Sequence, residues 1–177
     1  MQDYDLSSWR HSCGVVLQDS HVFSESLARN IAVEDKHIDR TRLRIAARQS
    51  NLEEFIEKLP LKYQTMVGAE GVGLSRGQEQ RIFIARALYK DPSFVFLDEA
   101  TNSLAANTER IITGNLLDFC KGRTVLIVAH RLSTIRHADK IVVLHKGRIV
   151  EEGTHDELCA GHGYYYELIN SQWIAMG

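Results

Sequence analysis

The chain has 177 residues, of which 44% are apolar and 25% charged, and its formal net charge is −2. This length and composition are typical of one globular domain with its own core. The near-neutral charge argues against capture of nucleic acid by bulk electrostatics. No apolar run is long enough to span a bilayer and no signal peptide opens the sequence, so we expect the chain itself to be soluble.

The first third of the sequence predicts a buried strand followed by helices. Residues 3–10 fit the end of a hairpin or a short helix, and the apolar run 13–17 lacks alternation, as is typical of a buried parallel strand. It leads into Gln18, where a polar side chain at the carboxyl end of a strand can face a ligand crevice. Apolar spacing then predicts helices near 27–31, 38–47 and 52–59, the last of them stopped by Pro60.

The middle of the sequence carries most of the candidate chemistry. Ser75 can cap the helix that follows it, and the free amides at such a helix start can bind an anion. The apolar run 94–97 predicts a second buried strand, closed by Asp98 and Glu99. Two acids there are costly to bury unless a cation or substrate uses them. On a strand they would point in opposite directions, one toward a metal shell and the other toward a water.

The remaining sequence predicts a helix, a strand and a hairpin. We expect an amphipathic helix over 107–119, with Ile111, Ile112, Leu116 and Phe119 on its apolar face. A third buried strand over 124–129 leads into His130, a candidate hydrogen-bond donor to phosphate. Strands at 140–144 and 148–150 flank a Lys-Gly turn, which predicts a hairpin.

The C-terminal segment predicts two short helices. Thr154 and Glu157 form a capping box, and the tyrosine-rich stretch after residue 163 continues as a terminal helix. His155, Cys159 and His162 lie close in sequence, but no fourth zinc ligand accompanies them. The three cysteines have no CxxC spacing, which favours reduced thiols.

Four of these motifs, in this order, resemble those of the nucleotide-binding domain of ABC transporters, and the resemblance covers nearly the whole chain. Gln18 resembles the Q-loop glutamine and His130 the switch histidine. The segment 74–78, LSRGQ, resembles the signature loop LSGGQ, whereas 94–98 resembles the Walker B strand and Glu99 the catalytic glutamate. The segments around them, such as QRIFIARALYKDP, are similar to the exporter branch, and within it to peptide, bacteriocin or toxin exporters.

The resemblance implies an α/β fold, an incomplete P-loop NTPase (ABC ATPase) fold whose mostly parallel sheet carries an inserted helical subdomain. The whole chain, 1–177, would be one partial ABC ATPase domain. Residues 1–21 and 92–177 would form the RecA-like core, and residues 22–91 the helical subdomain with the signature loop.

The resemblance also implies roles in ATP hydrolysis. Two domains would meet head to tail and enclose ATP. Asp98 and Gln18 would bind Mg²⁺, and Glu99 would polarise the attacking water. His130 would contact the γ-phosphate, and Gln18 would also couple the site to the membrane domain. The nucleotide held by the partner would be bound by four consecutive residues, Ser75, Arg76, Gly77 and Gln78.

Three departures from the family pattern matter. No GxxxxGK[ST] phosphate loop occurs in the sequence, so we expect the isolated chain to bind ATP weakly or not at all and to be inactive. Ala105 stands where the D-loop aspartate belongs, and Arg76 replaces the middle glycine of the signature. In the family the phosphate-loop strand lies in the sheet beside the strand ending at Ala129. Its absence here would leave a gap in the sheet with unpaired backbone groups, and we expect this gap to be closed by rearrangement, a swapped element or association of copies.

Two interpretations of function follow, and a third is less favoured. The chain could be the C-terminal part of an ATPase domain at the cytoplasmic side of the membrane, working with a second nucleotide-binding domain and a transmembrane domain to export a peptide or toxin. It could instead be a naturally truncated regulatory subunit that presents its signature loop to ATP on an intact partner. The exporter-like segments and the lack of coiled-coil arms argue against a DNA-repair ATPase.

Overall fold

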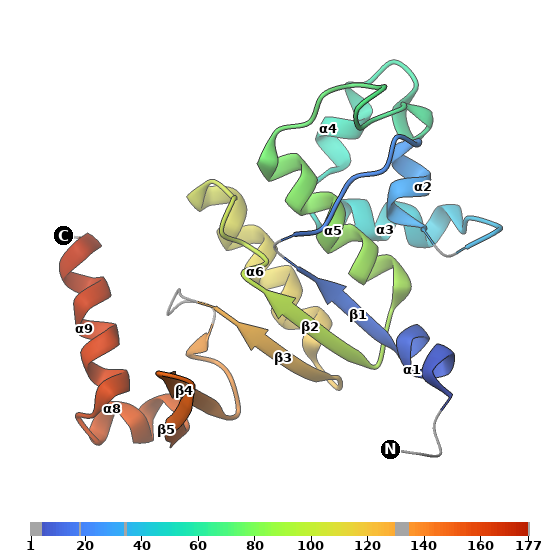
Figure 1. Ribbon diagram of the computed structural model, residues 1–177. Helices are drawn as coiled ribbons and strands as arrows, with labels where there is room; N and C mark the ends of the chain where they lie inside the picture. Colours follow the sequence, from blue (N-terminus) through green and yellow to red (C-terminus); the bar gives the residue numbers. More distant parts are fainter. Residues whose placement is uncertain (1–4, 18, 34, 130–134, 177) are drawn as a thin grey trace. The chain divides into compact units, whose positions relative to one another are not determined.

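A parallel sheet forms the centre of the first part of the molecule. The computed structural model describes residues 5–17, 19–33, 35–129 and 135–176. They form two compact units, residues 1–128 and 129–177. In the first unit the strand order is β1 (Cys13–Val16), β2 (Phe94–Asp98) and β3 (Thr124–Val128) (Figure 1). Cys13 pairs with Phe94 and Asp98 with Val128, so the carboxyl ends of the strands lie at one edge.

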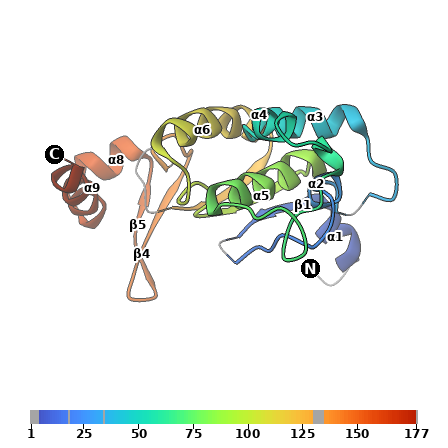
Figure 2. The same cartoon turned by 90° about the horizontal axis from the view of Figure 1, so that it is seen from above.

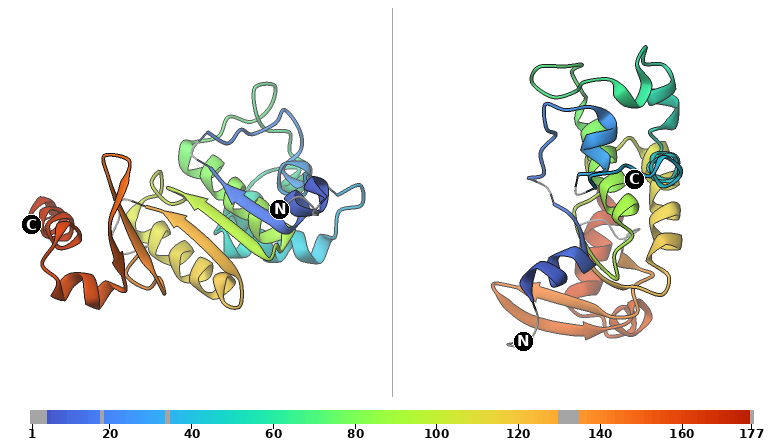
Figure 3. Two further views of the ribbon diagram at one scale, coloured as in Figure 1. Left: turned by 60° about the horizontal axis from the view of Figure 1, so that its bottom comes forward. Right: turned by 90° about the vertical axis from the view of Figure 1, so that its right-hand side faces the viewer.

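Helices α5 (Arg76–Lys90) and α6 (Ala106–Cys120) lie on the same side of this sheet (Figures 2 and 3). Their buried side chains join those of β1, β2 and the shorter helices in one hydrophobic core. The other elements of the unit are α1 (Leu6–Ser12), α2 (Leu27–Ile31), α3 (Arg40–Gln49), α4 (Glu53–Glu57) and the 3₁₀ turn η1 (Lys62–Gln64). Helix α3 packs against α5, and α2 packs against both α5 and η1.

The opposite face of the sheet is less covered than the sequence predicts. The apolar runs predict strands buried on both faces, but Leu126 is 59% exposed and Val128 51% exposed within the described chain. Val15 on β1 faces solvent as well. The start of β2 is shielded on this side, because the ring of Trp9 from α1 lies 4.8 Å from that of Phe94. The expectation of complete burial is therefore wrong for β1 and β3.

Helix α6 shows a second difference from the prediction. Ile112, Leu116 and Phe119 are buried against the sheet as expected, but Ile111 is 45% exposed. Ile111 directly precedes Ile112 in the sequence. Because a helix turns by about a quarter of a revolution per residue, the side chain of Ile111 points away from the apolar stripe.

The second unit has its own small core. Strands β4 (Ile141–His145) and β5 (Arg148–Gly153) form the predicted antiparallel hairpin, with Lys146 and Gly147 both at positive φ in the turn. Helices α8 (His155–Ala160) and α9 (Tyr164–Met176) follow. The core is made by Ile141, Val143, Leu158, Tyr165 and Ile169.

The predicted fold class is confirmed: the chain is α/β, its three-stranded sheet is parallel, and helices are inserted between β1 and β2. Residues 6–12 form a helix, which decides between the two alternatives for the N-terminal segment. The proposed division into a RecA-like core and a helical subdomain stays a prediction. In the part of the chain that the structure describes, no helix has both the length and the apolar character needed to cross a membrane.

Candidate functional site

The two acids lie at the carboxyl edge of the sheet, but only one of them is in a strand. Asp98 is the last residue of β2 and is half-buried. Glu99 has left the strand: its φ is +49°, and its N–H donates to the carbonyl of Val128 at 2.9 Å. The prediction that strand alternation points the two acids in opposite directions is therefore wrong for Glu99. Its direction is set by a left-handed backbone held against the end of β3.

A tight turn follows Glu99 and is fixed from several sides. The N–H of Asn102 donates to the carbonyl of Glu99 at 3.1 Å, and the side-chain Nδ2 of Asn102 donates to Oε2 of Glu99 at 2.5 Å. Ala100 and Thr101, between them, are both buried. The carbonyl of Ala100 accepts a hydrogen bond from Nε2 of Gln80 on α5 at 2.8 Å. The turn thus ties the acidic edge of the sheet to α5.

The start of α5 is the predicted capped helix. Ser75 accepts from the N–H of Gln78, and the side chain of Gln78 accepts from the N–H of Ser75 at 2.8 Å, which is a complete capping box. Arg76 is exposed in the first turn, so its bulk displaces no neighbour within the chain. A Cβ on Gly77 would lie 3.2 Å from the carbonyl oxygen of Ser103, so glycine at 77 allows the close approach of the turn that follows Glu99.

Six of the eight candidate residues fall within the described chain, and the structure gathers them around this turn. Asp98 and Glu99 precede it, whereas Ser75 to Gln78 start the helix to which Gln80 ties it. Gln18 and His130 lie outside the described residues, and their roles stay predictions.

One buried network further along α5 was not predicted from the sequence. Arg86 on α5 donates to the carbonyl and to the side-chain oxygen of Asn30, at 2.5 and 2.9 Å, and to the carbonyl of His21 at 2.8 Å. Asn30 is completely buried and also donates to the carbonyls of Phe23, Glu25 and Ser26. Burial lowers the pKa of Arg86 to about 10. The sequence signal available for this network was an amide side chain, Asn30, within the apolar segment LARNI.

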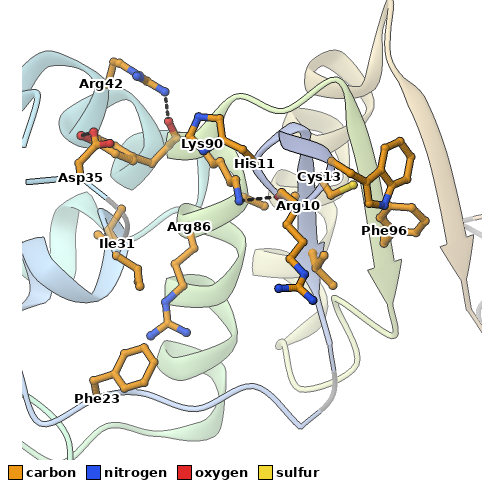
Figure 4. A pocket seen from close by; sticks show the side chains of 16 residues that line it. Arg10, His11, Cys13, Phe23, Ile31, Asp35, Arg42, Arg86, Lys90 and Phe96 are labelled. Atoms are coloured by element: carbon orange, nitrogen blue, oxygen red, sulfur yellow. Dashed lines mark hydrogen bonds between the residues drawn. The ribbon is translucent and has the colours of Figure 1, made fainter. Parts of the chain in front are cut away.

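A pocket of about 570 Å³ lies beside this network, next to β1 (Figure 4). Basic side chains from α1, α3 and α5 line it together with the apolar Phe23, Ile31 and Val33. Two of the basic groups donate hydrogen bonds to backbone carbonyls. Lys90 donates to the carbonyl of Arg10 at 3.0 Å, and Arg42 donates to the carbonyl of Tyr89. Cationic charge therefore outweighs the one acidic side chain of the lining, Asp35.

The side chains that could ligate a metal are dispersed within the described residues. Within the described ranges, no three side chains of His, Cys, Asp or Glu converge on a possible metal position. His155 and Cys159 do meet, with Sγ 3.8 Å from both ring nitrogens, but the ring of His162 makes an edge contact with Tyr166 instead. Mg²⁺ commonly needs only one or two carboxylates because waters and substrate phosphates complete its shell. Asp98 fits that requirement.

Comparison with known proteins agrees with the motifs. The profile of the family described as ABC transporter matches residues 1–102. An ATP-dependent lipid A-core flippase of Chromohalobacter salexigens is 46% identical over 173 residues, which are 98% of this chain and 30% of the flippase. The toxin RTX-I translocation ATP-binding protein of Actinobacillus pleuropneumoniae is 48% identical over 160 residues, which are 90% of this chain and 23% of that protein.

A solved structure gives the same answer for the fold. The structure of a bacterial Atm1-family ABC exporter with ATP bound superposes with a TM-score of 0.88 and 38% identity, covering 94% of this chain and 29% of that one. The chain thus spans less than a third of the length of each of these three relatives. Because the family profile covers more than half of its residues, the chain belongs to the ABC transporter family.

Proposed function

We propose that this chain supplies the acidic edge and the signature helix of an ATP site in an ABC exporter, where ATP hydrolysis drives transport. The observation that carries the proposal is the turn 99–104. It holds Glu99 beside the end of β3 and is bonded through Ala100 to Gln80, one turn below the Ser75 cap. The parts needed for positioning water and for contacting phosphate are therefore mechanically joined.

Each part has a chemical role in this proposal. Glu99 polarises the attacking water, and Asp98 holds the shell of a Mg²⁺ ion, which neutralises phosphate charge when bound. Ser75 and Gly77 present a helix start with its backbone amides to phosphate oxygens held by a facing domain. The capping box occupies the N–H of Ser75 and of Gln78, so the amides of Arg76 and Gly77 remain for such a contact. Gln18 and His130 are proposed to complete the site.

The chain has no phosphate loop in its sequence, so we propose that the phosphates of its own ATP are held by residues outside these 177. The isolated chain is then expected to bind Mg-ATP weakly and to show no turnover. Calorimetry with Mg-ATP tests this expectation, and tight binding with turnover by the chain alone would contradict it.

A chimera tests the function itself. The matching segment of the Chromohalobacter lipid A-core flippase would be replaced by this whole chain, since the two are 46% identical over 173 residues. The purified chimera in lipid nanodiscs is expected to hydrolyse ATP. Glu99→Gln should reduce kcat by about 100-fold or more while ATP binding persists, because a general base is lost and the shape is kept. Glu79→Gln, an acid in the first turn of α5, is the matched control.

The outcomes separate the alternatives. A chimera that binds ATP but never hydrolyses it would contradict the catalytic role and would leave the truncated regulatory subunit as the better interpretation. That subunit would still raise the ATPase rate of an intact nucleotide-binding domain added in trans, and Ser75→Ala should abolish the increase.

The partners follow from the same proposal. A second nucleotide-binding domain would meet the signature helix, and a transmembrane domain would insert a segment into the basic pocket next to β1. Val33 and Phe23 line that pocket and are about half exposed, at 47% and 50%, which suits an apolar contact with a docked helix. Val33→Asp should uncouple the ATPase of the chimera from its membrane part, whereas Val72→Asp, at an exposed valine outside the pocket lining, should not.

The exported substrate is proposed to be a peptide or a protein toxin. The toxin RTX-I translocation protein of Actinobacillus pleuropneumoniae and the cyclolysin secretion/processing protein of Bordetella pertussis are each 48% identical to the chain. Two lipid A-core flippases are 45–46% identical. Equivalent chimeras in the RTX-I translocator and in the flippase compare the two classes. Greater recovery of toxin secretion than of lipid transport is expected, and the reverse would favour a lipid substrate.

A further inference from the structure

The side chain of Asn102 donates a hydrogen bond to the carboxylate of Glu99, the residue that follows β2. Its Nδ2 lies 2.5 Å from Oε2 of Glu99. The amide nitrogen can only donate, so Oε2 of Glu99 is the acceptor. Asn102 is itself exposed, so burial of its own surface does not explain why it is held in this position.

The backbone on both sides of the pair is fixed independently of this hydrogen bond. The N–H of Glu99 is bonded to Val128, the carbonyl of Ala100 to Gln80, and Leu104 donates to the carbonyl of Thr101 at 3.1 Å. Leu104 and Thr101 are buried. Removing the Asn102 amide would therefore leave the turn in place, while Oε2 of Glu99 would lose this donor.

We propose that Asn102 is a positioning residue for Glu99: its amide holds the carboxylate in the rotamer that faces the attacking water. This rests on the proposed role of Glu99. The left-handed backbone at Glu99 makes such a restraint necessary, because φ of +49° moves the side chain away from the direction that strand alternation would give it. A carboxylate that polarises water loses efficiency when its orientation is not fixed.

The test uses the same full-chain chimera and separates kcat from KM. Asn102→Asp keeps the shape but replaces the donor with a second carboxylate, so kcat should fall at least about tenfold with KM for ATP changed less than about twofold. Asn102→Ser keeps a shorter donor and should recover part of the rate. Asn107→Asp, an exposed asparagine in the first turn of α6, makes the same charge change and should leave kcat unaltered.

A direct measurement on the chain alone avoids dependence on turnover. In the ¹⁵N–¹H spectrum the side-chain amide of Asn102 should shift when Glu99 is changed to Gln, and that of Asn107 should not. An unperturbed Asn102 resonance, or an active chimera whose kcat is the same with Asn102→Asp, would overturn the positioning role. A drop in the thermal unfolding midpoint that accounts for the lost rate would overturn it as well. A chimera inactive with every residue native contradicts the proposed function instead, and the spectrum still decides on the contact.

Discussion

Arg86 and Asn30 are joined by two hydrogen bonds although 56 residues separate them in the sequence. The guanidinium of Arg86 lies over the rings of Phe23 and Phe83, at 5.0 and 5.1 Å from their centres. Within the described residues, its hydrogen bonds go to carbonyl and amide oxygens and to no acidic side chain. A half-buried cation is thus stabilised by carbonyl and amide dipoles, and it links the segment 21–31 to the signature helix.

This arrangement predicts that Arg86→Lys lowers the free energy of unfolding of the first unit by about 2 kcal/mol. Lysine keeps the charge but cannot reproduce the fork of donors, so buried acceptors lose partners. Urea unfolding measures the loss, and hydrogen exchange should show faster exchange across residues 21–31. Arg44→Lys on the exposed face of α3 is the matched control and should stay within about 0.5 kcal/mol of the native value.

A second prediction concerns alkaline pH. Burial, and secondarily its hydrogen bond to Asp35, raise the pKa of Tyr89 above its ordinary value of 10.0. Above about pH 10 the unfolded chain loses this proton first, so the folded state binds more protons and stability from Tyr89 is lost as pH rises. Arg86, whose pKa is lowered to about 10, acts with the opposite sign.

Comparison of the native chain with Tyr89→Phe isolates the tyrosine from the arginine. The variant should be less stable at pH 9, because the N–H of Asp39 loses its acceptor. The difference between the two proteins should shrink toward pH 11, since only the native chain carries the ionisable phenol. Urea unfolding at both pH values measures this, and an equal difference at pH 9 and pH 11 would show the assignment to be wrong.

The third prediction concerns the departure at the D-loop position. Ala105 is the N-cap of α6, its backbone is extended, and no side chain caps the helix there. Ala105→Asp should therefore stabilise the first unit by about 1 kcal/mol, by accepting from a free amide of the first turn. Ala106→Asp, one residue further on, has the charge but not the cap geometry and should give less than half of that gain. Equal gains would mean that charge alone acts.

The fourth prediction concerns the second unit. Both carboxylate oxygens of Glu151 on β5 accept from the start of α9, from the N–H groups of Tyr164 and Tyr165, each at 2.8 Å. A Cβ on Gly163 would lie 1.8 Å from Oε1 of Glu151. Glu151→Ala and Gly163→Ala should each destabilise the unit by about 1–2 kcal/mol, because each removes the same cap.

A double-mutant cycle then tests whether the two changes share one cause. The double variant should be little worse than either single one, so the effects should be strongly non-additive. Glu152→Gln, at an exposed ion pair with Lys140, is the control and should change stability by less than about 0.5 kcal/mol. Fully additive losses would contradict a shared cap.

Local signals predicted the elements of this chain well. Ser75 and Thr154 each form the capping box that the spacing to Gln78 and Glu157 indicates, and the Lys-Gly turn forms its hairpin. These features depend on hydrogen bonds within four residues, so the information is contiguous in the sequence. The family and the α/β class were predictable for the same reason, because the motifs are short and ordered.

What could not be predicted depends on distant partners. The Arg86 network joins residues far apart in the sequence, and the positive φ of Glu99 results from the hydrogen bond of its N–H to the end of β3. The exposure of Leu126 and Val128 follows from which neighbours lie on each face of the sheet, and an apolar run carries no information about that. Apolar content alone therefore overestimated how completely β3 is buried.

The left-handed backbone at Glu99 has a consequence for directed evolution. Glycine or asparagine would relax the chain at this position, whereas glutamate carries a conformational cost of about 1 kcal/mol. A randomised library at codon 99 sorted only for folded protein should therefore enrich glycine and asparagine. The same library sorted for ATP-driven transport, in the chimera, should return glutamate. Disagreement between the two selections would measure, at one residue, how much stability the molecule gives up for its chemistry.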